Sequence, residues 1–572
     1  MRALAPLLLV ASWALFACGD DDGPAPEDAS APDARAEDAG VDAGPMAMDW
    51  PAEYPPRSTV PAEGVRRDLF LVRGVTAPAN PETGEATPEQ LGYTQVVRYR
   101  RDVDPPAPAR AIVVAMPGFL GGGPSFEGLA RAMVRLGLDG EPIEVWAIDR
   151  RSNLLEDLRG MDAAEEQGNP EIAQGYYFGD DTIGGEAFGG YVPQGDVSFM
   201  SEWGLATHVE DLRRVIALVP EAERQQRVFL MGHSLGASFT EAYAAWRFED
   251  GTRGVEELAG LVLIDGALGD APSTEEAYLE GSSAGGFPSP GLEGIRTGNQ
   301  RYTTLPLLGI DVYARAEISS LRALVAPDEV VEDFGRARVL GTLMGLRVDR
   351  VPPMTNEAAL AVAFDDEFQP LGFVRAKLGH LVGPTETYES ALAGGAELLR
   401  PSDPEAEVSW EDALEADPNE YTPVRNLAES FAHGRSNFAE WYFPTRLPLD
   451  LSAVGGAAVA EDGWQAALGL RAFDGGLIDA PILAIANGLV GDPERFEAIR
   501  ERVAATVGEG RPAAGVARSD ERAFQVVDAV DLEHLDPVFA DENTPGNPVP
   551  EAVLGFVAEH AAEGTVAVER ME

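Results

Sequence analysis

The sequence predicts an α/β fold, in which a mostly parallel β-sheet carries helices on both faces. Short, continuous apolar runs alternate with segments whose apolar residues recur at helical spacing. This alternation stops near residue 268 and resumes near residue 477. A Gly-x-Ser-x-Gly motif at 232–236 lies directly between an apolar run and a helical segment. We therefore expect one sheet, interrupted by a large insertion, with a serine at a sharp strand-to-helix turn.

The N-terminus has the pattern of an export signal. Met1-Arg2-Ala3 precedes an apolar run over 7–17 that is too short to span a membrane. We assign residues 1–17 to a signal peptide. The run ends in Leu15-Phe16-Ala17-Cys18, which resembles the lipobox of bacterial lipoproteins and implies a lipid on Cys18. The expected location is the bacterial cell envelope, lipid-anchored at the outer membrane or periplasmic face, and the alternative is a secreted protein.

Residues 18–63 are predicted to form a disordered acidic tether, because Asp, Ala, Pro and Gly dominate and few apolar side chains could form a core. Across the chain, 43 Lys and Arg oppose 96 Asp and Glu, a formal charge of −53. This balance excludes binding to a nucleic-acid backbone. The single cysteine excludes an internal disulfide and a cysteine-based metal site.

The first part of the α/β core is assigned to 64–268 and the second to 477–572. Between them, 269–476 shows helical segments, such as 357–364 and 386–399, and no convincing buried strand, so we expect a mainly helical cap. Such a cap would lie over the carboxyl edge of the sheet, where ligands of open parallel sheets bind. Strands are expected at 69–72, 94–99, 111–116, 143–148, 228–231, 261–264, 481–486 and 524–530.

Ser234 is the candidate nucleophile. The run 228–231 precedes it and the helical segment 237–245 follows it, so its hydroxyl would stand clear of the sheet. Gly232 and Gly236 remove side chains that would clash at such a turn. A second Gly-x-Ser-x-Gly, around Ser283, follows a helix-like acidic segment instead of a strand, and we interpret Ser283 as a loop serine.

The order and spacing of these motifs resemble the α/β-hydrolase superfamily, with a cap inserted between its sixth and seventh strands. The resemblance covers about 64–268 and 477–572, and it implies a catalytic Ser, acid and His in that chain order. Of the six histidines, His534 alone closely follows the last strand, so it is the expected general base.

The acid has two candidates. Asp492 follows the seventh strand and is the first choice, although an aspartate before a proline is also a good helix N-cap. Asp265, at the end of the sixth strand, is the alternative. The oxyanion hole is expected to use the backbone N–H groups of Leu235 and Phe119. We expect no metal or organic cofactor, because the sequence has no ligand cluster or nucleotide fingerprint.

The resemblance implies a serine hydrolase that cleaves a small-molecule or lipid carboxylic ester. A serine at this turn argues against haloalkane dehalogenase and epoxide hydrolase chemistry, for which this fold uses an aspartate. Peptidase, thioesterase and acyltransferase reactions would use the same three residues. A non-catalytic, surface-anchored binding protein on a hydrolase scaffold is the alternative from another class.

Overall fold

A computed structural model of the chain describes residues 57–566 and 568, apart from 283–288, 299, 306, 414–416, 418, 433–434, 437 and 540–545. The signal peptide, Cys18, most of the tether, Ser283 and His433 therefore lie outside the described residues. No helix in the described part of the chain is long and apolar enough to cross a membrane.

A nine-stranded sheet, ordered β1-β2-β3-β5-β4-β8-β9-β16-β17, forms the centre of the molecule. The first three strands are antiparallel, and every pair from β5 to β17 is parallel. This is the topology of the α/β-hydrolase fold, so the predicted fold class is confirmed. The strands are β1 (Arg57–Ala62), β2 (Val65–Arg73), β3 (Tyr93–Arg101), β4 (Ala111–Met116), β5 (Ile143–Asp149), β8 (Val228–His233), β9 (Gly260–Ile264), β16 (Ile482–Ala486) and β17 (Phe524–Asp528).

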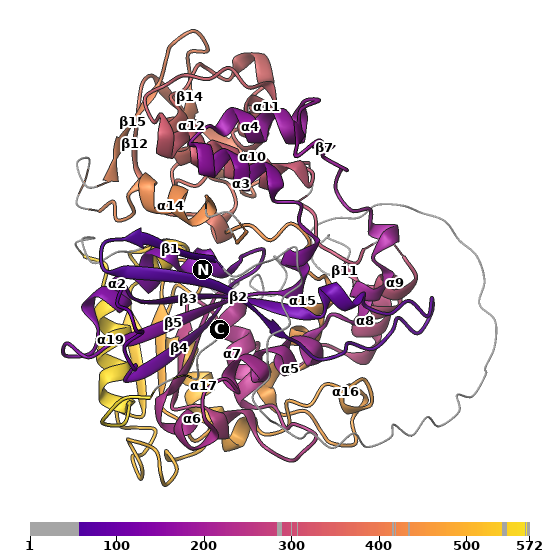
Figure 1. The fold of residues 1–572 in the computed structure, drawn as a ribbon, viewed down its shortest axis with the longest axis vertical. Helices are drawn as coiled ribbons and strands as arrows, with labels where there is room; N and C mark the ends of the chain where they lie inside the picture. Colours follow the sequence, from indigo (N-terminus) through magenta and orange to yellow (C-terminus); the bar gives the residue numbers. More distant parts are fainter. Residues whose placement is uncertain are drawn as a thin grey trace.

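Helices cover both faces of the sheet. In Figure 1, α2 (Glu127–Leu136) and α19 (Val549–His560) lie on one side of the strands, and α5 (Leu205–Ile216) and α7 (Leu235–Ala244) on the other. The strands β4, β5, β8 and β9 are buried along their whole length. Continuous apolar runs are the pattern that burial on two faces requires. Shorter core helices are α6 (Glu221–Arg227), α17 (Glu497–Arg502) and α18 (Asp536–Phe539).

The sheet begins earlier than the sequence predicts. β1 pairs with β2 in antiparallel register, so part of the predicted 18–63 tether belongs to the core. Its sequence, Arg-Ser-Thr-Val-Pro-Ala, has only a short apolar stretch and carries a proline. Proline is accepted on edge strands, because their outer N–H groups have no strand to bond. β1 is a strand because its backbone pairs with β2, whereas its own residues do not predict a strand.

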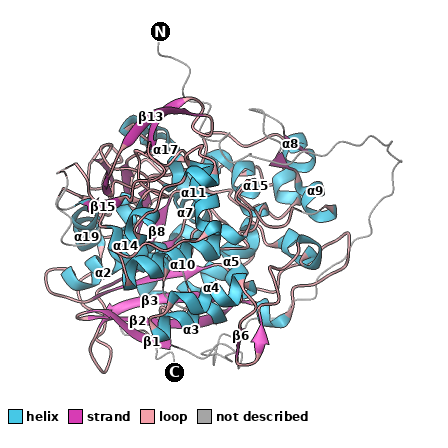
Figure 2. Ribbon diagram, turned by 90° about the horizontal axis from the view of Figure 1, so that it is seen from above, coloured by secondary structure: helices cyan, strands magenta, loops and turns pink. Residues whose placement is uncertain are grey.

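The insertion lies where the sequence predicts it: β9 and β16 are neighbours in the sheet although residues 265–481 separate them. Its helices are α8 (Glu275–Glu280), α9 (Leu292–Thr297), α10 (Asp311–Val325), α11 (Phe334–Leu343), α12 (Asn356–Ala361), α14 (Val424–Phe431), α15 (Arg446–Ala453) and α16 (Trp464–Ala467). Only part of the insertion forms a cap. In Figure 1, α10, α11, α12 and α14 lie above the sheet, whereas α8, α9, α15 and α16 lie beside it. Seen from above, α10, α11 and α14 lie over β8 and α7 (Figure 2).

Two further features of the cap differ from the prediction. The segment predicted as a helix over 386–399 is a hairpin, β13 (Thr385–Ser390) and β14 (Ala396–Pro401), and β12 (Gly379–Val382) pairs with β15 (Ser409–Asp412). The cap also includes α3 (Arg159–Gln167) and α4 (Pro170–Phe178), which come from the long connection between β5 and β8. Two insertions therefore build the cap, and Arg322 of α10 forms an ion pair with Glu171 of α4 between them.

Two carboxyl groups are fully buried where these insertions meet. Trp441 donates its backbone N–H to Glu156 at 2.7 Å and its indole N–H to Glu317 at 2.8 Å. The second oxygen of each carboxyl has no hydrogen-bond partner among the described residues. Burial raises the pKa of both groups well above the usual range, and the charge of Glu317 raises the pKa of Glu156 further. The folded protein therefore favours the protonated form.

The substitution Glu317→Gln is expected to raise the melting temperature at pH 8, with a gain that disappears toward pH 4. The raised pKa means that the folded state holds a proton that the unfolded state releases above about pH 4.5. The wild type therefore loses stability as pH rises through this window, by up to about 1.4 kcal/mol per pH unit, and the glutamine variant does not. Thermal unfolding of both proteins across pH tests this, with the exposed Glu501→Gln as control. A difference in melting temperature between Glu317→Gln and the wild type that does not change with pH would contradict this prediction.

Candidate active site

Ser234 lies at the sharp turn between β8 and α7. Its backbone adopts φ 57° and ψ −122°, a conformation that residues other than glycine rarely adopt. Its N–H donates to the Ile264 carbonyl of β9 at 2.9 Å, which helps to hold the turn. Backbone strain at a serine between a strand and a helix is the geometry of a nucleophile elbow, so the predicted local structure is present.

The two glycines of the motif allow this turn because side chains would not fit there. A Cβ on Gly232 would lie 2.0 Å from the Gly236 carbonyl oxygen, and one on Gly236 would lie 2.0 Å from the Met116 carbonyl oxygen. Gly118 is similarly close, because a Cβ there would lie 3.0 Å from the Ser234 Cβ. The absence of these side chains brings the loop after β4 against the serine.

His534 follows β17 and forms a hydrogen bond with a buried aspartate. Its Nδ1 lies 2.6 Å from Oδ2 of Asp265, which directly follows β9. The Asp265 carboxylate also accepts the backbone N–H groups of Leu489 at 2.9 Å and Val490 at 2.7 Å. Burial acts to raise the pKa of Asp265, but His534 and these two amides outweigh it and hold the pKa below its usual range. The carboxylate is therefore charged and fixed in position.

This arrangement leaves Nε2 of His534 as the atom that can act as a base, since Nδ1 donates to Asp265. Ser234 and His534 line the same cavity. In the described part of the chain, the Ser234 hydroxyl is not hydrogen-bonded to the His534 ring. Catalytic hydrogen bonds are often long before substrate binds and shorten in the complex. The side chains of Ser234 and His534 therefore share one cavity.

The first choice for the acid, Asp492, is wrong in this geometry. Its side chain is exposed, and its Oδ1 accepts the Glu494 N–H at 2.9 Å as the N-cap of the 3-10 turn Pro493–Phe496. The same loop does serve the site, because Leu489 and Val490 from it donate to Asp265. The alternative acid of the sequence analysis, Asp265, is the one that meets His534.

His233 supports the histidine loop and is not a second base. Its Nε2 lies 2.8 Å from the His534 carbonyl oxygen, and the two rings are 4.4 Å apart between centroids. Burial, with the neighbouring His534, lowers the pKa of His233 to about 3, so the ring is neutral and donates this bond. This hydrogen bond fixes the backbone of His534.

Arg150, which directly follows β5, shapes the candidate oxyanion loop. Its guanidinium donates to the carbonyl oxygens of Pro117 at 2.8 Å, Gly121 at 3.0 Å and Gly118 at 3.3 Å. Carbonyl and N–H point in opposite directions across a trans peptide, so the Phe119 N–H points away from Arg150. Glu440 pairs with Arg150 at 2.8 Å and keeps it buried.

The two expected oxyanion donors come from separate elements. Phe119 lines the cavity beside Ser234, and its ring packs edge-on to Phe443 with centroids 4.9 Å apart. Leu235 is the first residue of α7, where backbone N–H groups have no partner within the helix. Both positions are next to Ser234, in space or in sequence. Their role in binding an oxyanion stays a prediction.

A cavity of about 130 Å³ runs from Ser234 into the cap. Its walls are mainly apolar and come from α10, α11, α12 and the segments that flank them. Representative lining residues are Leu305, Leu308, Val312, Leu340, Leu360 and Phe364. An apolar chain linked to a carbonyl at Ser234 would be removed from water here. Phe431 of α14 also lines the cavity, whereas the nearby aromatic residues Trp441, Tyr442 and Phe443 do not.

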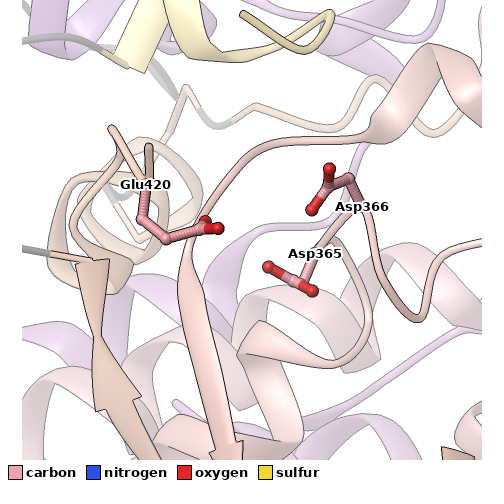
Figure 3. Close-up of side chains that lie close together, drawn as sticks. All are labelled: Asp365, Asp366 and Glu420. Atoms are coloured by element: carbon pink, nitrogen blue, oxygen red, sulfur yellow. The ribbon is translucent and has the colours of Figure 1, made fainter. Parts of the chain in front are cut away.

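Three carboxyl groups of the cap, on Asp365, Asp366 and Glu420, lie close together (Figure 3), with their nearest oxygens within 4.8 Å of one another. Burial and the neighbouring Asp366 raise the pKa of Asp365 well above its usual range and that of Glu420 to about 7. Asp365 already accepts two backbone N–H groups. The spacing suits a cation, but protons relieve the same repulsion, so we assign this cluster no metal.

No protein-family model and no curated protein matches the chain. Among solved structures, it is similar to a candidate lipase from Sulfolobus solfataricus at 13% identity and a TM-score of 0.41, covering 88% of this chain and 99% of that chain. It is also similar to a thermophilic esterase from Thermogutta terrifontis, at 11% identity and a TM-score of 0.33, covering 86% and 99%. It is similar as well to the Cif epoxide hydrolase from Acinetobacter nosocomialis, at 10% identity and a TM-score of 0.32, covering 89% of this chain and 99% of that chain. At these TM-scores the likenesses carry no argument about activity.

Proposed function

We propose that the protein is a serine hydrolase that cleaves carboxylic esters through an acyl-enzyme on Ser234. The observation that carries the proposal is the buried His534–Asp265 pair, whose His534 lines one cavity with a serine held at a strained strand-to-helix turn. A serine hydroxyl needs a base to become a nucleophile, and a histidine oriented by a carboxylate is the usual base.

In the proposed reaction, Nε2 of His534 takes the Ser234 proton as Oγ attacks the ester carbonyl carbon. The carbonyl oxygen becomes an oxyanion, which the N–H groups of Phe119 and Leu235 would stabilise. The carbon–oxygen ester bond then breaks, and the leaving alcohol takes the proton from His534. Water repeats the sequence on the acyl-enzyme and releases the carboxylic acid. Asp265 stays ionised and stabilises the imidazolium in both halves.

Ester cleavage is preferred over peptide cleavage because of the cavity. Its apolar walls suit an acyl chain, and they offer few groups for a peptide backbone. Thioesterase and acyltransferase reactions would use the same acyl-enzyme and differ only in the leaving group or acceptor. A non-catalytic binding protein is disfavoured, because such a protein has no need of a strained serine beside a buried His–Asp pair.

Labelling with a fluorophosphonate tests the nucleophile directly. We expect the wild type to be labelled on Ser234, as located by peptide mapping, and to hydrolyse at least one member of a panel of aryl and alkyl esters. The substitution Ser234→Ala should remove both results. Labelling that persists in the variant would contradict the assignment, and labelling of the wild type without turnover of esters, thioesters or amides would favour a binding role.

We also propose that Cys18 carries a lipid and places the enzyme on a membrane of the bacterial cell envelope. The apolar run before Cys18 and the acidic segment after it support this. Labelled fatty acid is expected to be incorporated when the full-length protein is expressed in bacteria, and incorporation should be lost with Cys18→Ala. Label retained without Cys18 would contradict the lipoprotein assignment.

A further inference from the structure

Arg336, in the first turn of α11, brings a buried positive charge to the wall of the apolar cavity. It is 7% exposed. Its guanidinium donates to Oδ1 of Asn356 at 2.8 Å and to the carbonyl oxygen of Val331. These bonds use two of its five N–H groups, and the other three have no acceptor among the described residues.

No carboxylate in the described part of the chain pairs with Arg336, in contrast to its neighbours. Arg322 pairs with Asp333 at 2.8 Å, and Arg315 pairs with Asp311 at 2.8 Å. The other oxygen of Asp333 accepts the backbone N–H of Arg336, not its side chain. Burial, with the charge of Arg322, lowers the pKa of Arg336 to about 10, although the charges of Asp333 and Glu171 act in the opposite direction, so the side chain is still charged at neutral pH.

A buried charge without a salt-bridge partner is costly, and a ligand that places a carboxylate in the cavity would lower that cost. This chain carries 96 Asp and Glu, yet no described carboxylate forms a salt bridge with the side chain of Arg336. Asp333 and Glu171 act on its charge only through space, and both pair with Arg322 instead. The remaining wall of the cavity is mainly Leu, Val, Ala and Phe. A purely apolar acyl chain would leave the charge unpaired and remove water from it.

We propose that the acyl group of the substrate ends in a carboxylate, which Arg336 binds while the ester carbonyl lies at Ser234. The substrate class is then the half-esters of dicarboxylic acids, with an apolar spacer between ester and carboxylate. A guanidinium matches a carboxylate with paired hydrogen bonds, and the match is strongest away from water. This inference rests on the proposed ester hydrolysis and specifies which esters are cleaved.

The test compares two series of p-nitrophenyl esters with matched acyl chain lengths. One series ends in a methyl group and the other in a carboxylate. For the wild type we expect the carboxylated ester to have the higher kcat/KM at one chain length, by about 10- to 100-fold. That length measures the distance from Ser234 to Arg336.

Substitutions of Arg336 test whether this residue causes the preference for carboxylated esters. Arg336→Met keeps much of the side-chain volume without the charge and should abolish or reverse the preference, while hydrolysis of the methyl-ended ester continues. Arg336→Lys should keep part of it. Arg338→Met is the matched control, because Arg338 lies on the same helix, does not line the cavity and pairs with Asp311; it should leave the ratio unchanged.

The outcomes separate this inference from the proposed function. A wild type that prefers methyl-ended esters at every chain length overturns the inference and leaves ester hydrolysis intact, whether or not the Arg336 variants fold. A preference that survives Arg336→Met in a folded variant also overturns it. A wild type that hydrolyses no ester of either series, and is not labelled by fluorophosphonate, overturns both.

Discussion

Replacing Ser234 by alanine is expected to lower kcat for ester hydrolysis by about 10⁴- to 10⁶-fold. Alanine keeps the Cβ that the turn already accommodates and removes only the oxygen that forms the acyl-enzyme. The variant should fold with a melting temperature close to that of the wild type, because alanine carries the same backbone strain at φ 57° as serine. Initial rates at high enzyme concentration, with thermal unfolding beside them, provide the measurement.

The second Gly-x-Ser-x-Gly of the chain supplies the matched control for this substitution. Ser283 has the same local motif without a strand before it, and Ser283→Ala should leave kcat and KM unchanged. If Ser283→Ala reduced kcat as far as Ser234→Ala, the assignment of the nucleophile from its strand context would fail. If Ser234→Ala kept more than about a tenth of the activity, an acyl-enzyme on Ser234 would be excluded.

The sheet was predictable because its strands are continuous apolar runs. Each of the eight predicted strands from 69–72 to 524–530 overlaps an observed one, and β4 has the predicted bounds. Burial on both faces of a parallel sheet removes polar residues from the strand, so composition alone locates it. The elbow was predictable for a similar reason, since its glycines are required by backbone contacts under 3 Å.

The structure of the cap was less predictable from the sequence, because its strands and helices are buried to different extents. β13 has mostly exposed side chains and pairs with β14 around a Gly-Gly turn, so polar, helix-favouring residues such as Glu386 and Glu389 stand in a hairpin. The contacts of α3 and α4 with α10 join segments more than a hundred residues apart. No local pattern reports such pairings, which depend on the tertiary structure that surrounds them.

The acid shows most clearly how a local signal can mislead. Asp492 has the position after a strand that the resemblance implies, and its sequence context is equally that of a helix N-cap. Asp265 has no motif of its own. Its function depends on β9 lying beside β8 and on a histidine 269 residues later in the chain. The geometry that selects Asp265 is long-range, and the sequence could offer it only as the second candidate.

The substitution Asp265→Asn is expected to lower kcat about 10⁴-fold with little change in KM. An amide can present an N–H to His534, which would place the ring proton on Nε2 and leave no base facing Ser234. It also loses the negative charge that stabilises the imidazolium. Asp492→Asn should change kcat by less than about twofold, because asparagine caps a helix as well as aspartate does.

Combining Asp265→Asn and Asp492→Asn each with Ser234→Ala distinguishes most sharply which aspartate acts together with Ser234. Residues that act as a unit are strongly non-additive, so adding Asp265→Asn to Ser234→Ala should cause almost no further loss. Both single variants need the same folded fraction, which circular dichroism and thermal unfolding establish. If Asp492→Asn abolished turnover while Asp265→Asn retained it, the Nδ1–Asp265 contact would be a resting arrangement, and the loop 487–492 would have to rearrange to bring Asp492 to His534 during the reaction.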